Sequence, residues 1–360
     1  MTRRTRVFMA LAAGVLVLGV CVGLVAMYSG LPVLAQFGAS RPELAYLPQD
    51  VRLVAYANVR QVMDSEIHRK LRDARPDGAG GSDRRGGPGG ARENDLFRQA
   101  GIDVETDVDL VVVSLTGDAN DETPLVLARG RFDDDLIETL IRQRGGGVEE
   151  YRGVRLLTHR DEGRAMGVSF VEPNLVAFGS EQAVRLAIDT KAGAVPDVAG
   201  NDTVMGMIRD VDDGNAWAVG RFDAISRRAP LPADVARQLP PLDWFSVSGH
   251  INGGLDGTLR LETRDAAAAD DLRQVVQGFL ALARLQTGRL EQFRALIESI
   301  NLGGQGTTVT VTFSVPPTVI DALAALRNER RGVPPDTGAD ARPQTTPPAP
   351  ARPPARPPRT

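Results

Sequence analysis

The pattern of apolar and polar positions changes period several times along the chain, and each change predicts an element. Short apolar or alternating runs predict strands, whereas apolar residues three and four positions apart predict helices. The predicted strands are Leu53–Val59, Leu110–Leu115, Leu125–Phe132, Val154–Thr158, Met166–Val171, Leu175–Phe178, Ala216–Phe222, Phe245–Ile251, Thr258–Thr263 and Thr307–Val315. The predicted helices are Asp64–Arg72, Asp133–Arg144, one capped by Ser180, one beginning at Asp265, Arg289–Ile300 and one beginning at Pro316-Pro317.

The order of these elements repeats. Val108–Ile141 and Trp244–Val276 both read as strand, polar turn, strand, acidic helix start and apolar helix. This order predicts an α+β protein of mainly antiparallel sheets packed with helices, in two modules over 46–195 and 196–332 that an internal duplication would explain. The alternative is one α+β domain with a large sheet.

The chain begins with Arg3, Arg4 and Arg6, followed by the uncharged segment Val7–Tyr28. This segment is near the roughly 20 residues that an α-helix needs to cross a bilayer, and positive charge tends to stay on the cytoplasmic side. We therefore expect an N-terminal transmembrane helix over 7–28, a single-pass anchor in the inner (cytoplasmic) membrane. Residues 1–6 would form a cytoplasmic stub, and a linker over 29–45 would lead to an extracytoplasmic fold.

A cleaved signal peptide is the alternative, since Val33-Leu34-Ala35 is a tolerable cleavage sequence. The apolar core of such a peptide spans roughly 7–15 residues, so the longer segment here favours an uncleaved anchor. Both interpretations export the same globular region.

Two segments lack the apolar residues that a packed core needs. Residues 76–92 are rich in Gly and Arg, and we expect a mobile loop there. Residues 333–360 consist largely of Pro, Ala, Arg and Thr, which predicts a disordered tail with polyproline II character.

Composition excludes several chemistries. Cys21 is the only cysteine and falls inside the predicted span, so the exported part has no disulfide, no cysteine-based zinc site and no catalytic thiol. The formal net charge of −4 gives no support for a nucleic-acid partner.

Candidate metal ligands are scattered. His68, His159 and His250 are far apart in sequence and form no dense ligand motif. Two acidic runs, Asp118–Glu122 and Asp210–Gly214, have alternating oxygens but depart from the calcium-loop pattern at positions that it requires. We interpret both runs as turns.

No motif for covalent catalysis is present either. The chain has no Gly-x-Ser-x-Gly elbow and no Ser-x-x-Lys pair. Ser246, Ser248 and His250 alternate on one predicted strand and share a face, which does not by itself make a triad. We therefore assign no catalytic, cofactor-binding or metal-binding residue, and we expect no cofactor.

One segment resembles a known group of proteins. It consists of Leu47-Pro48-Gln49-Asp50, the predicted strand Leu53–Val59 and the predicted helix Asp64–Arg72. The segment resembles a loose group of uncharacterised exported bacterial proteins, a domain of unknown function whose modules begin in this order. The resemblance covers about the first exported module. It implies an extracytoplasmic setting and supplies no site residues.

These observations favour a membrane-anchored extracytoplasmic protein with a non-catalytic binding or envelope-assembly role, its partner being an envelope protein or polymer. The alternative is an envelope hydrolase or other enzyme whose composite site makes no sequence motif. A sensor is a third hypothesis, although a six-residue cytoplasmic stub could signal only through a partner.

The predicted topology can be tested with reporters fused after Arg330. A reporter that is active only outside the cytoplasm should be active there, and a reporter that works only in the cytoplasm should be silent. The reverse pair of results would contradict the topology.

Overall fold

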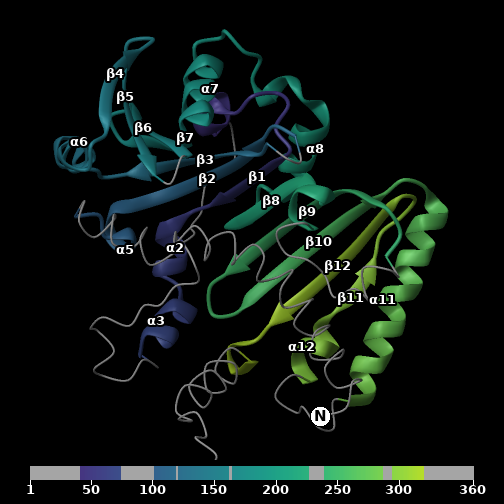
Figure 1. The fold of residues 1–360 in the computed structure, drawn as a ribbon. Helices are drawn as coiled ribbons and strands as arrows, with labels where there is room; N and C mark the ends of the chain where they lie inside the picture. The colour runs from purple at the N-terminus through teal and green to yellow at the C-terminus, as the bar shows by residue number, and fades with distance from the viewer. Residues whose placement is uncertain are drawn as a thin grey trace, which may run out of the picture.

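One twelve-stranded antiparallel sheet organises the structure (Figure 1). The computed structural model describes residues 41–73, 101–118, 121–161, 164–226, 239–286 and 294–319. The strands, in chain order, are β1 Leu53–Ala57, β2 Val108–Thr116, β3 Thr123–Gly130, β4 Gly147–Tyr151, β5 Val154–Asp161, β6 Arg164–Glu172, β7 Leu175–Ser180, β8 Ala216–Arg221, β9 Leu242–Ile251, β10 Leu255–Thr263, β11 Asn301–Gly303 and β12 Thr308–Val315.

Helices flank this sheet and join its strands. They are η1 Pro42–Tyr46, α2 Val59–Met63, α3 Glu66–Asp73, α5 Val104–Asp107, α6 Asp134–Gln143, α7 Glu181–Lys191, η2 Val198–Gly200, α8 Asp202–Val211, α9 Phe222–Ser226, α11 Ala266–Gln286 and α12 Arg294–Ser299.

The predicted fold class needs correction, although a large antiparallel sheet packed with helices is present. Instead of several sheets there is a single one, because β1 and β8 pair and so join what would otherwise be two open edges. Among the residues that the structure describes, no helix has the length and apolar character needed to cross a membrane. The predicted span 7–28, loop 76–92 and tail 333–360 lie outside the described residues.

The strand order is mirrored about the β1–β8 pair. One side runs β1-β2-β3-β7-β6-β5-β4 and the other runs β8-β9-β10-β12-β11. In each half a hairpin pairs with the first strand, a helix follows the hairpin, and a later strand pairs with the hairpin's second strand. A duplication would produce this order; shared ancestry of the two halves stays a prediction.

Alternating side chains give the sheet two distinct faces. The α7 face carries Val54 and Trp217 and is covered by α7 and α8, which form one core with the first half of the sheet. The α11 face carries Leu53 and Val247 and packs against α11 and the strands of the second half in a second core. Figure 1 shows α7 and α8 together on one side of the sheet and α11 running along the second half.

Helix starts follow the expected capping chemistry. The Ser180 hydroxyl caps α7 as predicted, accepting a hydrogen bond from the Ala183 N–H at 3.1 Å. The helix predicted at 64–72 is capped by Ser65, whose hydroxyl accepts a hydrogen bond from the His68 N–H.

The described fold begins inside the predicted linker. Leu44 and Tyr46 of η1 are buried in the core under α7. The Leu-Pro-Gln-Asp segment that follows pairs with 196–201: Val198 N–H donates to the Leu47 carbonyl, and Gln49 N–H donates to the Pro196 carbonyl. The start of the first predicted module is thus bonded to the start of the second.

A buried ion network fixes η1 to the sheet. Glu43 is only 2% exposed, and its Oε1 accepts from Arg129 Nε at 2.6 Å. Arg129 also contacts Glu172, whose other oxygen accepts from the Tyr46 hydroxyl. Burial, reinforced by the Glu172 carboxylate, raises the pKa of Tyr46 above its usual range. Burial alone would lower the pKa of Arg129, but the bonds to Glu43 and Glu172 outweigh it and raise that pKa.

Arg129→Met should therefore destabilise the fold by about 3 kcal/mol, because it leaves the Glu43 carboxylate buried without its cation. Urea denaturation of the full chain measures the change in the free energy of unfolding. Arg131→Met is the matched control, since the Arg131 side chain is 66% exposed. Equal stabilities for the two variants would contradict the structural role of the network.

Candidate functional site

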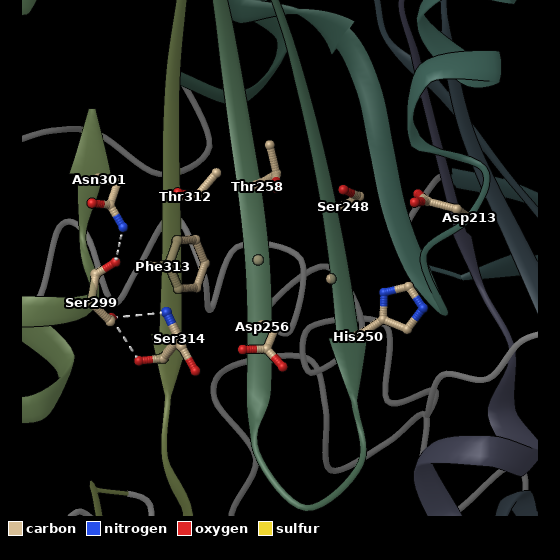
Figure 2. Close-up of a pocket in the computed structure, with 12 residues that line it drawn as sticks. Asp213, Ser248, His250, Asp256, Thr258, Ser299, Asn301, Thr312, Phe313 and Ser314 are labelled. Carbon is tan, nitrogen blue, oxygen red and sulfur yellow. Dashed lines mark hydrogen bonds between the residues drawn. The ribbon is translucent and has the colours of Figure 1, made fainter. Parts of the chain in front are cut away.

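An open polar trough lies on the α7 face of the second half of the sheet (Figure 2). It has a volume of about 360 Å³ and is bounded by β9, β10 and β12, the edge strand β11 and the turn after α8. We call this site the polar trough. Its lining residues are Asp213, Ser248, Gly249, His250, Asp256, Gly257, Thr258, Ser299, Asn301, Thr312, Phe313 and Ser314.

Strand register arranges the lining in rows that cross the strands. Asn301, Thr312, Thr258 and Ser248 face one another in turn across β11, β12, β10 and β9. We call these four residues the hydroxyl row, although Asn301 contributes an amide. Neighbouring strands lie about 4.8 Å apart, so the row is about 14 Å long.

A second row lies beside the first. Ser314 faces Asp256 on β10, and Asp256 faces His250 on β9. Figure 2 shows both rows along the same stretch of sheet, with Asp213 beyond β9. The trough therefore combines neutral hydroxyls with two carboxylates and one imidazole.

The protein leaves much of this lining unsatisfied. Within the described residues, the side chains of Ser248, Thr258 and Thr312 make no hydrogen bond to another residue, and neither do those of Asp256 and His250. Their donors and acceptors are therefore available to water or to a ligand.

The charged side chains of β10 just beyond the trough have partners instead. Arg260 on β10 reaches α8, with Nη1 3.2 Å from Asp210 Oδ2. Glu262, two residues further along, accepts from the Thr308 hydroxyl at 2.7 Å. The charged side chains just beyond the trough are thus paired, whereas Asp256 and His250 inside it are not. The hydroxyls of Ser246 and Thr310, on the same face but outside the trough, also make no hydrogen bond to another described residue.

The matching part of the first half is apolar except for Ser114. Matching Ala55 of β1 to Ala218 of β8 gives each position of β2, β3 and β7 a counterpart on β9, β10 and β12, because the strands of the two halves pair in the same register. On the α7 face, Ser114 and Val112 of β2 correspond to Ser248 and Ser246 of β9. Leu125 and Leu127 of β3 correspond to Thr258 and Arg260 of β10, and Gly179 and Ala177 of β7 correspond to Thr312 and Thr310 of β12. Helix α7 packs on the first set. The second set offers no apolar bed for a helix.

Aromatic residues close one end of the trough. Ser248 faces Trp217 on β8, and Trp217 stacks on Tyr56 with ring centroids 5.5 Å apart. The Arg41 guanidinium lies 3.5 Å over the Tyr56 ring and donates from Nε to Asp212 at 2.6 Å. Burial raises the pKa of Tyr56 despite this nearby cation.

The opposite end lies at the edge of the sheet and is built by Ser299. Strand β11 has only three residues, so it cannot pair with the whole of β12. At Ser314 the Ser299 hydroxyl replaces the missing strand partner. It accepts a hydrogen bond from the Ser314 N–H and donates one to the Ser314 carbonyl oxygen, 2.9 Å away. This side chain covers the edge without blocking the trough.

Close packing beneath the trough requires a glycine. A Cβ on Gly257 would lie 2.4 Å from the Phe313 ring. The glycine therefore lets Phe313 lie against β10.

The arrangement does not assemble acyl-transfer chemistry. Ser248 and His250 are two residues apart on β9, about 7 Å along an extended strand, and share no hydrogen bond. His250 and Asp256 face each other across β9 and β10, but no ion pair joins them. In the described ranges, no group of three His, Cys, Asp or Glu side chains could hold a metal ion.

The other sequence candidates lie apart from one another. His68 Nδ1 is 3.0 Å from the Met63 carbonyl oxygen, and His159 is on β5 in the first half. In the run Asp210–Gly214, Asp210 and Asp212 pair with arginines, while Asp213 lines the trough. The run Asp118–Glu122 lies only partly within the described residues.

Sequence reasoning found Ser248 and His250 on one face and Asp256 near His250, but missed Thr258, Thr312 and Asn301 as their neighbours. The alternation of Thr with Val in β12 was the available signal, since it predicts a polar outer face.

Comparison with known proteins identifies no family. No family model matches the chain, and no curated protein does. Crystal form III of TP0453 is similar with a TM-score of 0.44 and 10% identity, covering 80% of this chain and 100% of that chain. For crystal form I of TP0453 the TM-score is 0.43 and the identity 12%, covering 81% and 99%. Likeness at this level carries no argument about function.

Ser299→Ala should destabilise the protein by about 1–3 kcal/mol, because the Ser314 backbone loses its partner. Ser314→Ala is the control, since the bonds to Ser299 use the Ser314 backbone and survive that change. Urea denaturation of both variants measures the difference. Equal free energies of unfolding would show that Ser299 does not hold this edge.

Proposed function

We propose that this chain is a non-catalytic binding protein that holds an envelope component in the polar trough. The observation that carries the proposal is the set of unpartnered polar side chains gathered there, Asp256 and His250 among them, while the charged side chains of Arg260 and Glu262 nearby are paired. Side chains that both donate and accept hydrogen bonds, gathered in an open site, suit a polar ligand. The predicted extracytoplasmic position is consistent with such a ligand and itself stays a prediction.

The hydrolase alternative has less support. It requires a nucleophile within hydrogen-bond reach of a base, and the Ser248 and His250 side chains share no such bond. The largest upward pKa shift of a tyrosine, that of Tyr46, belongs to the ion network around η1 rather than to the trough.

Co-sedimentation of the full chain with a purified insoluble envelope fraction tests the proposal. The wild-type protein should sediment with this fraction, and Thr258→Leu should reduce the retained protein about tenfold because the larger side chain fills the trough. Thr310→Leu is the matched control, on the same sheet face but outside the lining. A thermal melt of each variant verifies that it is folded.

Two results would overturn the proposal. One is retention that Thr258→Leu and Thr310→Leu change equally. The other is release of soluble products from the envelope fraction that stops in Ser248→Ala, which would favour the hydrolase.

A further inference from the structure

The ligand class can be narrowed from the geometry of the hydroxyl row, an inference that rests on the proposed binding function. We propose that the polar trough binds a linear, uncharged polysaccharide laid across the strands. Its sugar rings would follow Asn301, Thr312, Thr258 and Ser248.

Spacing is the first argument. The four side chains recur once per strand, at intervals of about 4.8 Å. A pyranose ring in an extended glycan has a comparable length, so successive rings would meet successive strands. The row of about 14 Å accommodates roughly three rings.

Hydrogen-bond chemistry is the second argument. A Ser or Thr hydroxyl both donates and accepts, and the Asn301 amide does the same through two atoms. Sugar hydroxyls have this dual character too. The hydroxyls of Ser248, Thr258 and Thr312 make no hydrogen bond to another residue in the described part of the chain. The Asn301 amide nitrogen donates to the Ser299 carbonyl, while the amide oxygen of Asn301 has no partner there.

Charge is the third argument. Asp213 and Asp256 place two carboxylates in the lining, against a single imidazole, that of His250. Arg260, the nearest arginine along β10, is already paired with Asp210. An anionic polymer such as a polyuronate or a phosphate-linked chain would be repelled, whereas a neutral sugar would offer hydroxyls to the carboxylates.

The shape of the site fits a chain that enters from one side. Trp217 is fully buried where the row reaches β8, so the trough ends there. At the other end Asn301 lies on the edge strand β11, beyond which a polymer can continue. A protein ligand fits less well, because Phe313, the only large apolar residue of the lining, points to the opposite face and packs against the second core.

Calorimetric titration of the full chain with two neutral series tests the inference: oligomers of N-acetylglucosamine and of glucose, one to six units long. At least one series should bind, with affinity rising about tenfold from one unit to three and levelling off beyond four, when the row is filled. Oligogalacturonate of equal length should bind at least about tenfold more weakly. Asp256→Asn should narrow that gap.

Matched variants locate the binding. Thr312→Val keeps the shape of the side chain and removes its hydroxyl, which should weaken binding about two- to tenfold. Thr310→Val, on the same strand and face but outside the lining, should change affinity less than twofold.

Failure of both neutral series, or binding that Thr312→Val and Thr310→Val affect equally, overturns the glycan inference. If envelope retention still depends on Thr258 in that case, the proposed binding function stands and the ligand belongs to another class. Loss of that dependence removes the binding function as well.

Discussion

The antiparallel pairing of β1 with β8 is the constraint on which the rest of the structure depends. Five residue pairs join the two halves, with Ala55 facing Ala218 at the centre. On the α11 face this seam carries alanines, Gly220 and Leu53, and on the α7 face it carries Tyr56 and Trp217, which stack. Each half builds outward from its own seam strand in the same order. A polar site on one half therefore has a structural counterpart on the other, and the two can be compared position by position.

That comparison explains how one strand order yields two different surfaces. In the first half both faces of strands such as β2 and β3 are apolar, and helices cover both. In the second half, β10 and β12 alternate strictly, and α11 packs on their apolar face. On the opposite face α8 packs on β8 and β9. The backbone arrangement does not require polarity on the α7 face, since Leu125 and Ala177 occupy the positions of Thr258 and Thr310. The hydroxyls there are a property of the sequence that the fold tolerates and a ligand can use.

Local patterns predicted most strands and the caps, but not the elements and neighbours that tertiary pairing creates. The alternation in β12 and the Ser180 cap are short-range signals, and both elements formed. Strand β4 has no alternation and exists because it pairs with β5. Helix α8 was not predicted, although its sequence carries a helix signal: the Asn201 cap is followed by Val204 and Ile208 at helical spacing. The trough could not be predicted in the same way, because the facing of Thr258 with Thr312 depends on the register between β10 and β12, which are distant in sequence.

A site made of neutral hydrogen bonds needs rigidity more than a charged site does. Each such bond contributes only about 0.5–1.5 kcal/mol net, so ordering the side chains or backbone on binding would cancel much of the gain. The ladder bonds hold the hydroxyl row in register before any ligand arrives. At the closed end, Arg41 binds Asp212 and lies over Tyr56, which fixes the turn that carries Asp213 against the sheet. Ser299 fixes the open end through the Ser314 backbone. These contacts lie outside the hydroxyl row yet hold both of its ends, so the row is ordered by side chains that are not part of it.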